Sequence, residues 1–186
     1  VIYVLIFCNE RFLGSTEEHK YRLYKSDDNG LTFQEASVIP FDTFNRGYGS
    51  IVFDGNGTLH AYTYYYGDET VIDHAVSQDQ GATWDVLAPC YVAHGVRNPQ
   101  TAFLDGVFIL HGRSNSLDHF VFYTSTDGAN WDEGTFVATG TAVPHYYSNN
   151  IKLKDEQGDF LLVQYSEAYF SSCVNIKHIK LRIKQA

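Results

Sequence analysis

Short runs of apolar residues, broken by turn-forming residues, follow one another along the whole chain. Within 46–89, four such runs occupy 48–54, 58–66, 70–77 and 84–88, with Gly and Asp residues between them. Runs of this length are typical of β-strands bounded by turns. No stretch places apolar residues three or four positions apart over the length of a helix, so the pattern predicts an all-β fold with very little helix.

Two separate sequence patterns recur with a common period. The first, which we call the Ser-Asp turn, has the form Ser-x-Asp-x-Gly-x-Thr-Phe/Trp at 26–33 and 77–84 and is one residue shorter at 125–131. The second is the start of a strand at positions 48, 99 and 147, and both series advance by 51 and then 48 residues. Four strands in each repeat of about 40–50 residues are typical of β-propeller blades. The sequence therefore predicts four-stranded antiparallel blades at about 1–40, 46–89, 97–138 and 145–186.

Strand counting indicates that the first and last blades are incomplete. Only two strands, 1–8 and 20–26, precede the first Ser-Asp turn, so the first blade lacks its innermost strand, and three strands follow the last turn. About three and a half blades would then form part of a ring, closed either by a missing N-terminal propeller half or by self-assembly, because open sheet edges favour pairing. The opening run, Val1 to Phe7, is too short to span a membrane and is expected to be a buried strand.

Each Ser-Asp turn has an evident structural role. Ser and Asp side chains accept hydrogen bonds from backbone N–H groups, and Gly adopts a positive φ without strain. The aromatic residue that ends each turn, Phe33, Trp84 or Trp131, is expected to bury its ring against the sheet. We therefore predict that all three turns stabilise the fold.

Composition narrows the classes of ligand. The chain has 13 Lys and Arg against 22 Asp and Glu, a formal net charge of −9 and no cluster of five basic residues, which disfavours nucleic-acid binding. A few arginines focused in one cleft can still bind a carboxylate. The 8 histidines show no metal-ligand spacing, so neither a metal nor a cofactor is expected. Cys8, Cys90 and Cys173 are interpreted as buried apolar side chains, with one disulfide and one free thiol as the alternative.

The Ser-Asp turn resembles the Asp box of sialidases and other bacterial-neuraminidase-repeat proteins. The segments 145–151, 161–167 and 176–181 are similar to the last blade of exo-sialidases. This resemblance implies a sialidase-like propeller, six-bladed when complete, that recognises glycans ending in sialic acid or a related acidic sugar. If the protein is active, the resemblance implies an exo-α-sialidase-type glycoside hydrolase, secreted, periplasmic or on the cell surface, with part of its site outside this chain. The alternative is a non-catalytic propeller that binds carbohydrate or protein.

The same resemblance implies roles for individual residues. Tyr147 occupies the position of the family's tyrosine nucleophile, and Glu167 that of a glutamate that orients an arginine in the catalytic site. Arg113, Arg97 and Arg46 flank inner strands and are candidates for binding the sugar carboxylate, with Arg113 matching the family best. A neutral phenol does not repel an anionic sugar, and planar guanidinium groups bind a carboxylate bidentately.

Simpler roles exist for each of these positions, namely a packing tyrosine, a solvent-exposed carboxylate and arginines in surface ion pairs. The chain also departs from the family pattern. It has Asn98-Pro99-Gln100 where related blades have Asn-Glu-Pro-Gln, so the glutamate that activates the tyrosine is not evident. The family's early-blade arginine and its acid/base aspartate fall outside this sequence.

Overall fold

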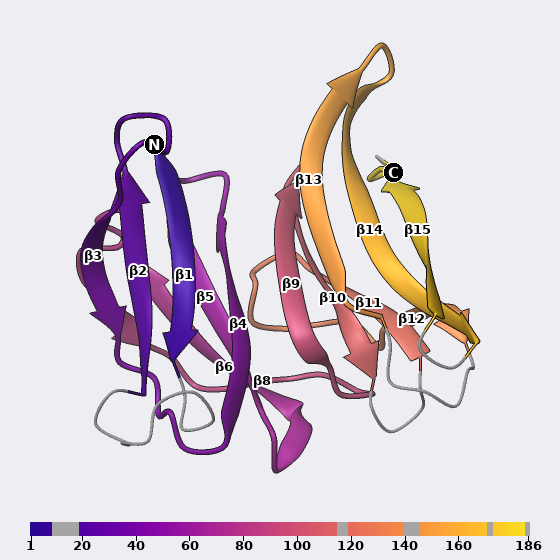
Figure 1. Ribbon diagram of the computed structural model, residues 1–186, viewed down its shortest axis with the longest axis horizontal. Helices are drawn as coiled ribbons and strands as arrows, with labels where there is room; N and C mark the ends of the chain where they lie inside the picture. The colour runs from indigo at the N-terminus through magenta and orange to yellow at the C-terminus, as the bar shows by residue number, and fades with distance from the viewer. Residues whose placement is uncertain (9–18, 115–118, 140–145, 171–172, 185–186) are drawn as a thin grey trace.

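The computed structural model describes residues 1–8, 19–114, 119–139, 146–170 and 173–184, and its strands form four antiparallel sheets (Figure 1). The all-β prediction is confirmed, and no helix of the described residues is long and apolar enough to cross a membrane. In chain order the strands are β1 (Ile2–Cys8), β2 (Lys20–Ser26), β3 (Gln34–Ile39), β4 (Arg46–Phe53), β5 (Leu59–Tyr65), β6 (Asp68–Ser77), β7 (Asp85–Val86), β8 (Cys90–Tyr91), β9 (Arg97–Leu104), β10 (Val107–Ser114), β11 (His119–Ser125), β12 (Thr135–Thr139), β13 (Ser148–Asp155), β14 (Gly158–Phe170) and β15 (Cys173–Leu181).

The strands are ordered within each sheet as they follow in the chain. The first sheet has the order β1-β2-β3, the second β4-β5-β6-β7, the third β9-β10-β11-β12 and the fourth β13-β14-β15. β8 pairs with β6 in the second sheet. The sequence did not predict this strand, because two residues are too few to show an apolar pattern.

The Ser-Asp turns hold their own backbone. In the second turn, the Ser77 hydroxyl accepts a hydrogen bond from Gly81 N at 2.8 Å, and Asp79 accepts from Thr83 N at 2.8 Å and from Thr83 Oγ1 at 2.6 Å. The first turn repeats these bonds, and in the third an asparagine replaces the threonine. The bond from the Thr83 hydroxyl, followed by that from its backbone N–H, lowers the pKa of Asp79 to about 2. The hydrogen bonding predicted for the turns is confirmed.

The aromatic residues that end these turns differ in burial. Trp84 packs against the core between the first and second sheets, and Trp131 against the core between the second and third. Phe33 is 42% exposed, so the predicted burial of its ring is wrong. By its place in the repeat, Phe33 faces away from the second sheet, and no described residues form a sheet on that side.

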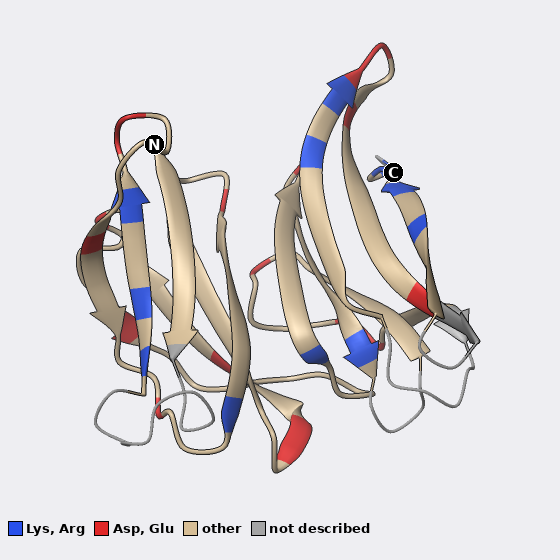
Figure 2. Cartoon of the chain, viewed as in Figure 1, with Lys and Arg blue, Asp and Glu red and all other residues tan. Residues whose placement is uncertain are grey.

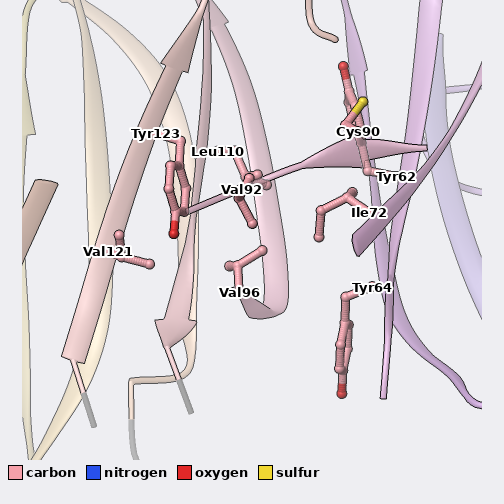
Figure 3. Packing of buried hydrophobic residues seen from close by; sticks show 9 residues of the cluster. All are labelled: Tyr62, Tyr64, Ile72, Cys90, Val92, Val96, Leu110, Val121 and Tyr123. Atoms are coloured by element: carbon pink, nitrogen blue, oxygen red, sulfur yellow. The ribbon is translucent and has the colours of Figure 1, made fainter. Parts of the chain in front are cut away.

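Apolar side chains fill the spaces between successive sheets. Leu5 and Phe7 of β1 pack against the core between the first and second sheets, whereas Ile2, Val4 and Ile6 are 36–43% exposed. The opening strand is therefore buried on one face only, and the prediction of a buried strand is wrong for the other. The cluster between the second and third sheets (Figure 3) comprises Tyr62, Tyr64, Ile72, Cys90, Val92, Val96, Leu110, Val121 and Tyr123.

The cysteines only partly match their interpretation as buried apolar residues. Cys90 is buried in the cluster of Figure 3, as expected, but Cys173 is exposed on β15, which is an edge strand. Both are free thiols, and the side chain of Cys8 lies outside the described part of the chain.

Candidate functional site

The innermost strands of three sheets lie next to one another and begin at the same end. Thr101 of β9 joins both neighbours: its Oγ1 lies 3.0 Å from Ser50 Oγ of β4, and its carbonyl accepts a hydrogen bond from Asn150 Nδ2 of β13 at 3.3 Å. The arrows of β4, β9 and β13 run in one direction (Figure 1), so their first residues gather at one end of the sheets. We call this end, defined by the first four residues of β4, β9 and the segment 146–149, the mouth.

The first two of these strands begin with a β-bulge. Arg46 pairs with Tyr65 and Gly49 with Thr63, so β4 contains one residue more than β5 over this interval. On β9, the pairs formed by Arg97 and then by Gln100 likewise leave one extra residue relative to β10. Bulges bend a strand and re-aim its side chains, and they are common beside functional sites.

The fourth sheet has a similar irregularity where the chain enters β13. The Ser166 carbonyl of β14 accepts a hydrogen bond from Tyr146 N at 2.9 Å, and the Ser166 N–H donates to Tyr147 O at 2.9 Å. Two residues, Tyr146 and Tyr147, therefore lie opposite the single residue Ser166. Tyr146 has φ of 67° and Asn98, in the bulge of β9, has φ of 54°. A bulky side chain rarely adopts a positive φ, and such strain persists where the surrounding structure imposes it. The conformation turns the next residue, Tyr147, outward, where it is 58% exposed.

A small cavity opens between the three strands at the mouth. Its volume is about 150 Å³, and it is lined by two tyrosines, two amides, a glycine and a serine: Tyr48, Gly49, Asn98, Gln100, Tyr147 and Ser148. Aromatic rings and amides are the side chains that commonly line sugar-binding sites, because they offer a stacking face and paired donors and acceptors. The structure thus brings Tyr147 together with side chains from two other sheets.

Two buried tyrosines lie against the start of β4 at the mouth. The Tyr21 hydroxyl donates to Gly47 O at 2.5 Å, and a Cβ placed on Gly47 would overlap the ring of Tyr64. Burial raises the pKa of both phenols far above the ordinary value, so they remain neutral. Glycine is required at this position by the close approach of the Tyr64 ring.

The basic residues of β4, β9 and β10 lie at the mouth end of the sheets (Figure 2), and two of them are already paired. Arg46 forms an ion pair with Asp73 and lies over the ring of Tyr65, 4.4 Å from its centroid. Arg97 pairs with Glu69 of β6, with Nη2 and Oε1 2.5 Å apart. Neither carboxylate was identified from the sequence, because the partners lie 27 and 28 residues away and the Arg97 pair joins two sheets.

Arg113 differs from these two arginines. It is only 5% exposed, and no carboxylate pairs with it among the residues that the structure describes. Its Nε has no hydrogen-bond partner there either. Arg113 lies two residues beyond His111 on one face of β10, and the His111 ring contacts Ser148 of the cavity wall at 3.0 Å. Arg113 also pairs across the sheet with Arg97, the first residue of β9, so it lies at the mouth end of the third sheet, although it is not one of the residues that line the cavity.

Glu167 is not brought against the tyrosine. Its carboxylate lies 3.4 Å from Lys177 Nζ, and within the described residues it pairs with neither Tyr147 nor an arginine. The backbone N–H of Tyr147 instead donates to Ser166 Oγ at 3.1 Å. The structure therefore gathers Tyr147 and Arg113 at the mouth but leaves Glu167 in a separate ion pair.

Comparison with known proteins gives structural relatives only. No family model and no curated protein matches the chain. An α-L-arabinanase of Penicillium chrysogenum is similar with a TM-score of 0.60 and 19% identity, over 91% of this chain and 56% of that protein. An α-L-arabinofuranosidase of Fusarium graminearum gives 0.61 and 15%, over 96% and 61%. The Hadza microbial sialidase Hz136 gives 0.57 and 23%, over 80% and 32%.

These identities are low, so the likeness shows the fold and nothing finer. The chain is part of a β-propeller of the kind found in glycoside hydrolases, which confirms the predicted fold class. The resemblance to sialidases is confirmed only at the level of the fold, because the arabinanase and the arabinofuranosidase are similar to the chain as well as the sialidase. The chain spans 61% or less of the length of these three proteins.

Proposed function

We propose that this chain carries a glycan-binding site of a glycoside-hydrolase-type propeller, and that the site takes an acidic sugar such as sialic acid. The observations that carry the proposal are the buried Arg113 at the mouth end of β10 and the mouth cavity lined by Tyr48, Tyr147 and amides. A buried cation without a partner is costly, and a carboxylate is its best complement.

The local charge favours an anionic ligand although the chain as a whole is acidic. The other basic side chains near the mouth, Arg46, Arg97 and Lys177, each have a carboxylate partner. One positive charge, that of Arg113, is left over among the described residues of the mouth. A sugar carboxylate would neutralise it, while the sugar ring would lie against the tyrosines.

The catalytic part of the proposal rests on Tyr147. Its exposed phenol faces the cavity and would act as the nucleophile if the site hydrolyses glycosides. The carboxylate expected to help, Glu167, pairs with Lys177, and no carboxylate of the described residues lines the cavity. Binding without hydrolysis is therefore the activity that the described residues support on their own, and turnover requires an acid/base group beyond these described residues.

Titration calorimetry with three sugars tests the binding proposal. The α-methyl glycoside of N-acetylneuraminic acid is compared with its carboxamide and with arabinobiose, the neutral sugar bound in the Penicillium structure. Arg113→Met should weaken binding of the acid by about tenfold or more, and should leave the carboxamide unaffected. The matched control is Lys154→Met, which removes a positive charge at the far end of β13. Equal effects of the two substitutions would refute the role of Arg113.

A fluorogenic sialic-acid glycoside tests hydrolysis separately. Turnover that disappears in Tyr147→Phe would establish a sialidase site in this chain. Binding with no turnover would support a glycan-recognising module. Tight binding of arabinobiose without binding of the acid would contradict the acidic-sugar proposal.

A further inference from the structure

One edge of the first sheet is unpaired where the corresponding edges of two other sheets are paired. The serine that begins each Ser-Asp turn sets the register: Ile2, Leu59 and Phe108 each pair with it in their own sheet. β1, β5 and β10 are therefore equivalent strands. β5 and β10 have a strand on both sides, whereas β1 has only β2 within the described chain.

Within the described part of the chain, the free edge of β1 has none of the features that normally prevent strand addition. The segment IYVLIFC contains no charged residue and no proline. Edge strands are usually protected by lysines, by proline or by a covering element. β13 and β15, at the edges of the fourth sheet, each carry lysines. β1 thus resembles an interior strand whose neighbour is not among the described residues.

A large apolar cavity lies beside this edge, far from the mouth. It has a volume of about 560 Å³, and its walls include Tyr3 of β1 and Ile51 and Phe53 of β4. The Tyr3 and Phe53 rings meet edge to face with centroids 5.3 Å apart. The face of β4 that lines the cavity is therefore apolar, and no strand of the described residues lies between this face and β1.

The next pair of sheets shows what fills such a space. In the second sheet β4 pairs with β5, and the face of β4 that points away from the cavity packs toward β9. Val52 packs against the apolar cluster of Figure 3, and Ser50 contacts Thr101 of β9. An innermost strand thus occupies, between the second and third sheets, the position that corresponds to the cavity.

We propose that the free edge of β1 and the adjacent cavity form a docking site for one extended β-strand from a polypeptide segment outside residues 1–186. The strand pairs antiparallel with β1, as β4 pairs with β5, and directs alternate apolar side chains toward Ile51 and Phe53. Main-chain hydrogen bonds supply the affinity and the apolar cavity supplies the specificity, as in other complexes formed by strand addition.

A register-matched graft tests the proposal. Because Leu59 and Ile2 are equivalent, a copy of residues 46–58 placed directly before Ile2 would supply the strand and its turn in the correct register. We expect the melting temperature to rise by about 5 °C or more, and the β1 amides on the free edge to exchange at least about tenfold more slowly. The matched control carries Ile51→Pro in the appended copy only, which removes strand pairing at its centre.

The possible results distinguish a strand from outside residues 1–186 from a second copy of this chain as the occupant of the site. A rise that is lost in the proline control supports the strand-docking site. Equal melting temperatures for the graft, its control and the parent, with unchanged exchange of β1, would overturn it. A parent chain that is already a dimer, with β1 amides protected only in the dimer, would also overturn it, because the occupant would then be a second copy.

Discussion

His111 provides a quantitative test of how the third and fourth sheets are joined. Its ring is fully buried, with Nδ1 3.0 Å from Ser148 Oγ and Nε2 3.0 Å from Asn150 Nδ2. The Asn150 amide donates to Nε2, so the neutral ring carries its proton on Nδ1 and donates it to Ser148. Protonation of Nε2 would remove the acceptor and place a charge in the core.

Burial lowers the pKa of His111 from 6.5 to about 3. A lowered histidine pKa means that the unfolded chain binds the proton more readily, so stability is fully present above pH 6.5 and is lost as pH falls toward 3. Each such histidine contributes a slope of about 1.4 kcal/mol per pH unit inside that window. His74, whose pKa burial lowers to about 4, adds an equal slope between pH 6.5 and 4. At pH 5 the two together remove about 4 kcal/mol, out of a typical total of roughly 5–15.

We predict that His111→Gln lowers the free energy of unfolding at pH 7.5 but reduces its slope between pH 6 and 5 by about 1.4 kcal/mol per pH unit. Urea unfolding followed by tryptophan fluorescence at pH 7.5, 6.0, 5.5 and 5.0 measures both quantities. His60, whose pKa burial also lowers, contributes to parent and variant alike and cancels in the difference. His178→Gln, at an exposed position of β15, controls for the loss of one imidazole. An unchanged slope in His111→Gln would refute the assigned burial of the neutral ring.

Three further predictions concern packing and thiol chemistry. Tyr62→Phe removes the hydrogen bond to a carbonyl of the third Ser-Asp turn and should cost about 1–2 kcal/mol in urea unfolding. Gly47→Ala should cost about 1–3 kcal/mol, because the new methyl group overlaps the Tyr64 ring; an unchanged urea midpoint would show that the ring moves freely. Burial raises the pKa of the Cys90 thiol to about 11, so peptide mapping after alkylation of the native protein at pH 8 should find Cys173 modified and Cys90 intact.

Much of the fold follows from local chemistry that the sequence displays. The Ser-Asp turns could be predicted because their hydrogen bonds join residues no more than four positions apart, as between Asp79 and Thr83. Strand positions could be predicted because the runs of apolar residues are bounded by turn-forming residues such as Gly and Asp. Burial of the outer face of the first sheet could not be predicted, because the described residues form no further sheet against Phe33 and Ile2, which the repeat pattern had suggested.

The site could be predicted only in part, for a related reason. Tyr147 and Arg113 were candidates because the resemblance to sialidases implies roles for both positions. The pairing of Arg97 with Glu69 could not be foreseen, since it depends on how one sheet is set against the next. The separation of Glu167 from Tyr147 likewise depends on the paired register of β14 and β15, which places Lys177 beside the carboxylate.

The most direct test of the proposed site is backbone NMR mapping of the chain with the α-methyl glycoside of N-acetylneuraminic acid. The proposal predicts that the largest saturable shift changes fall on the amides of Tyr48, Asn98, Arg113 and Tyr147 at the mouth. Changes that cluster instead around Tyr3, beside the apolar cavity, or an absence of saturable changes, would contradict a glycan site at the mouth.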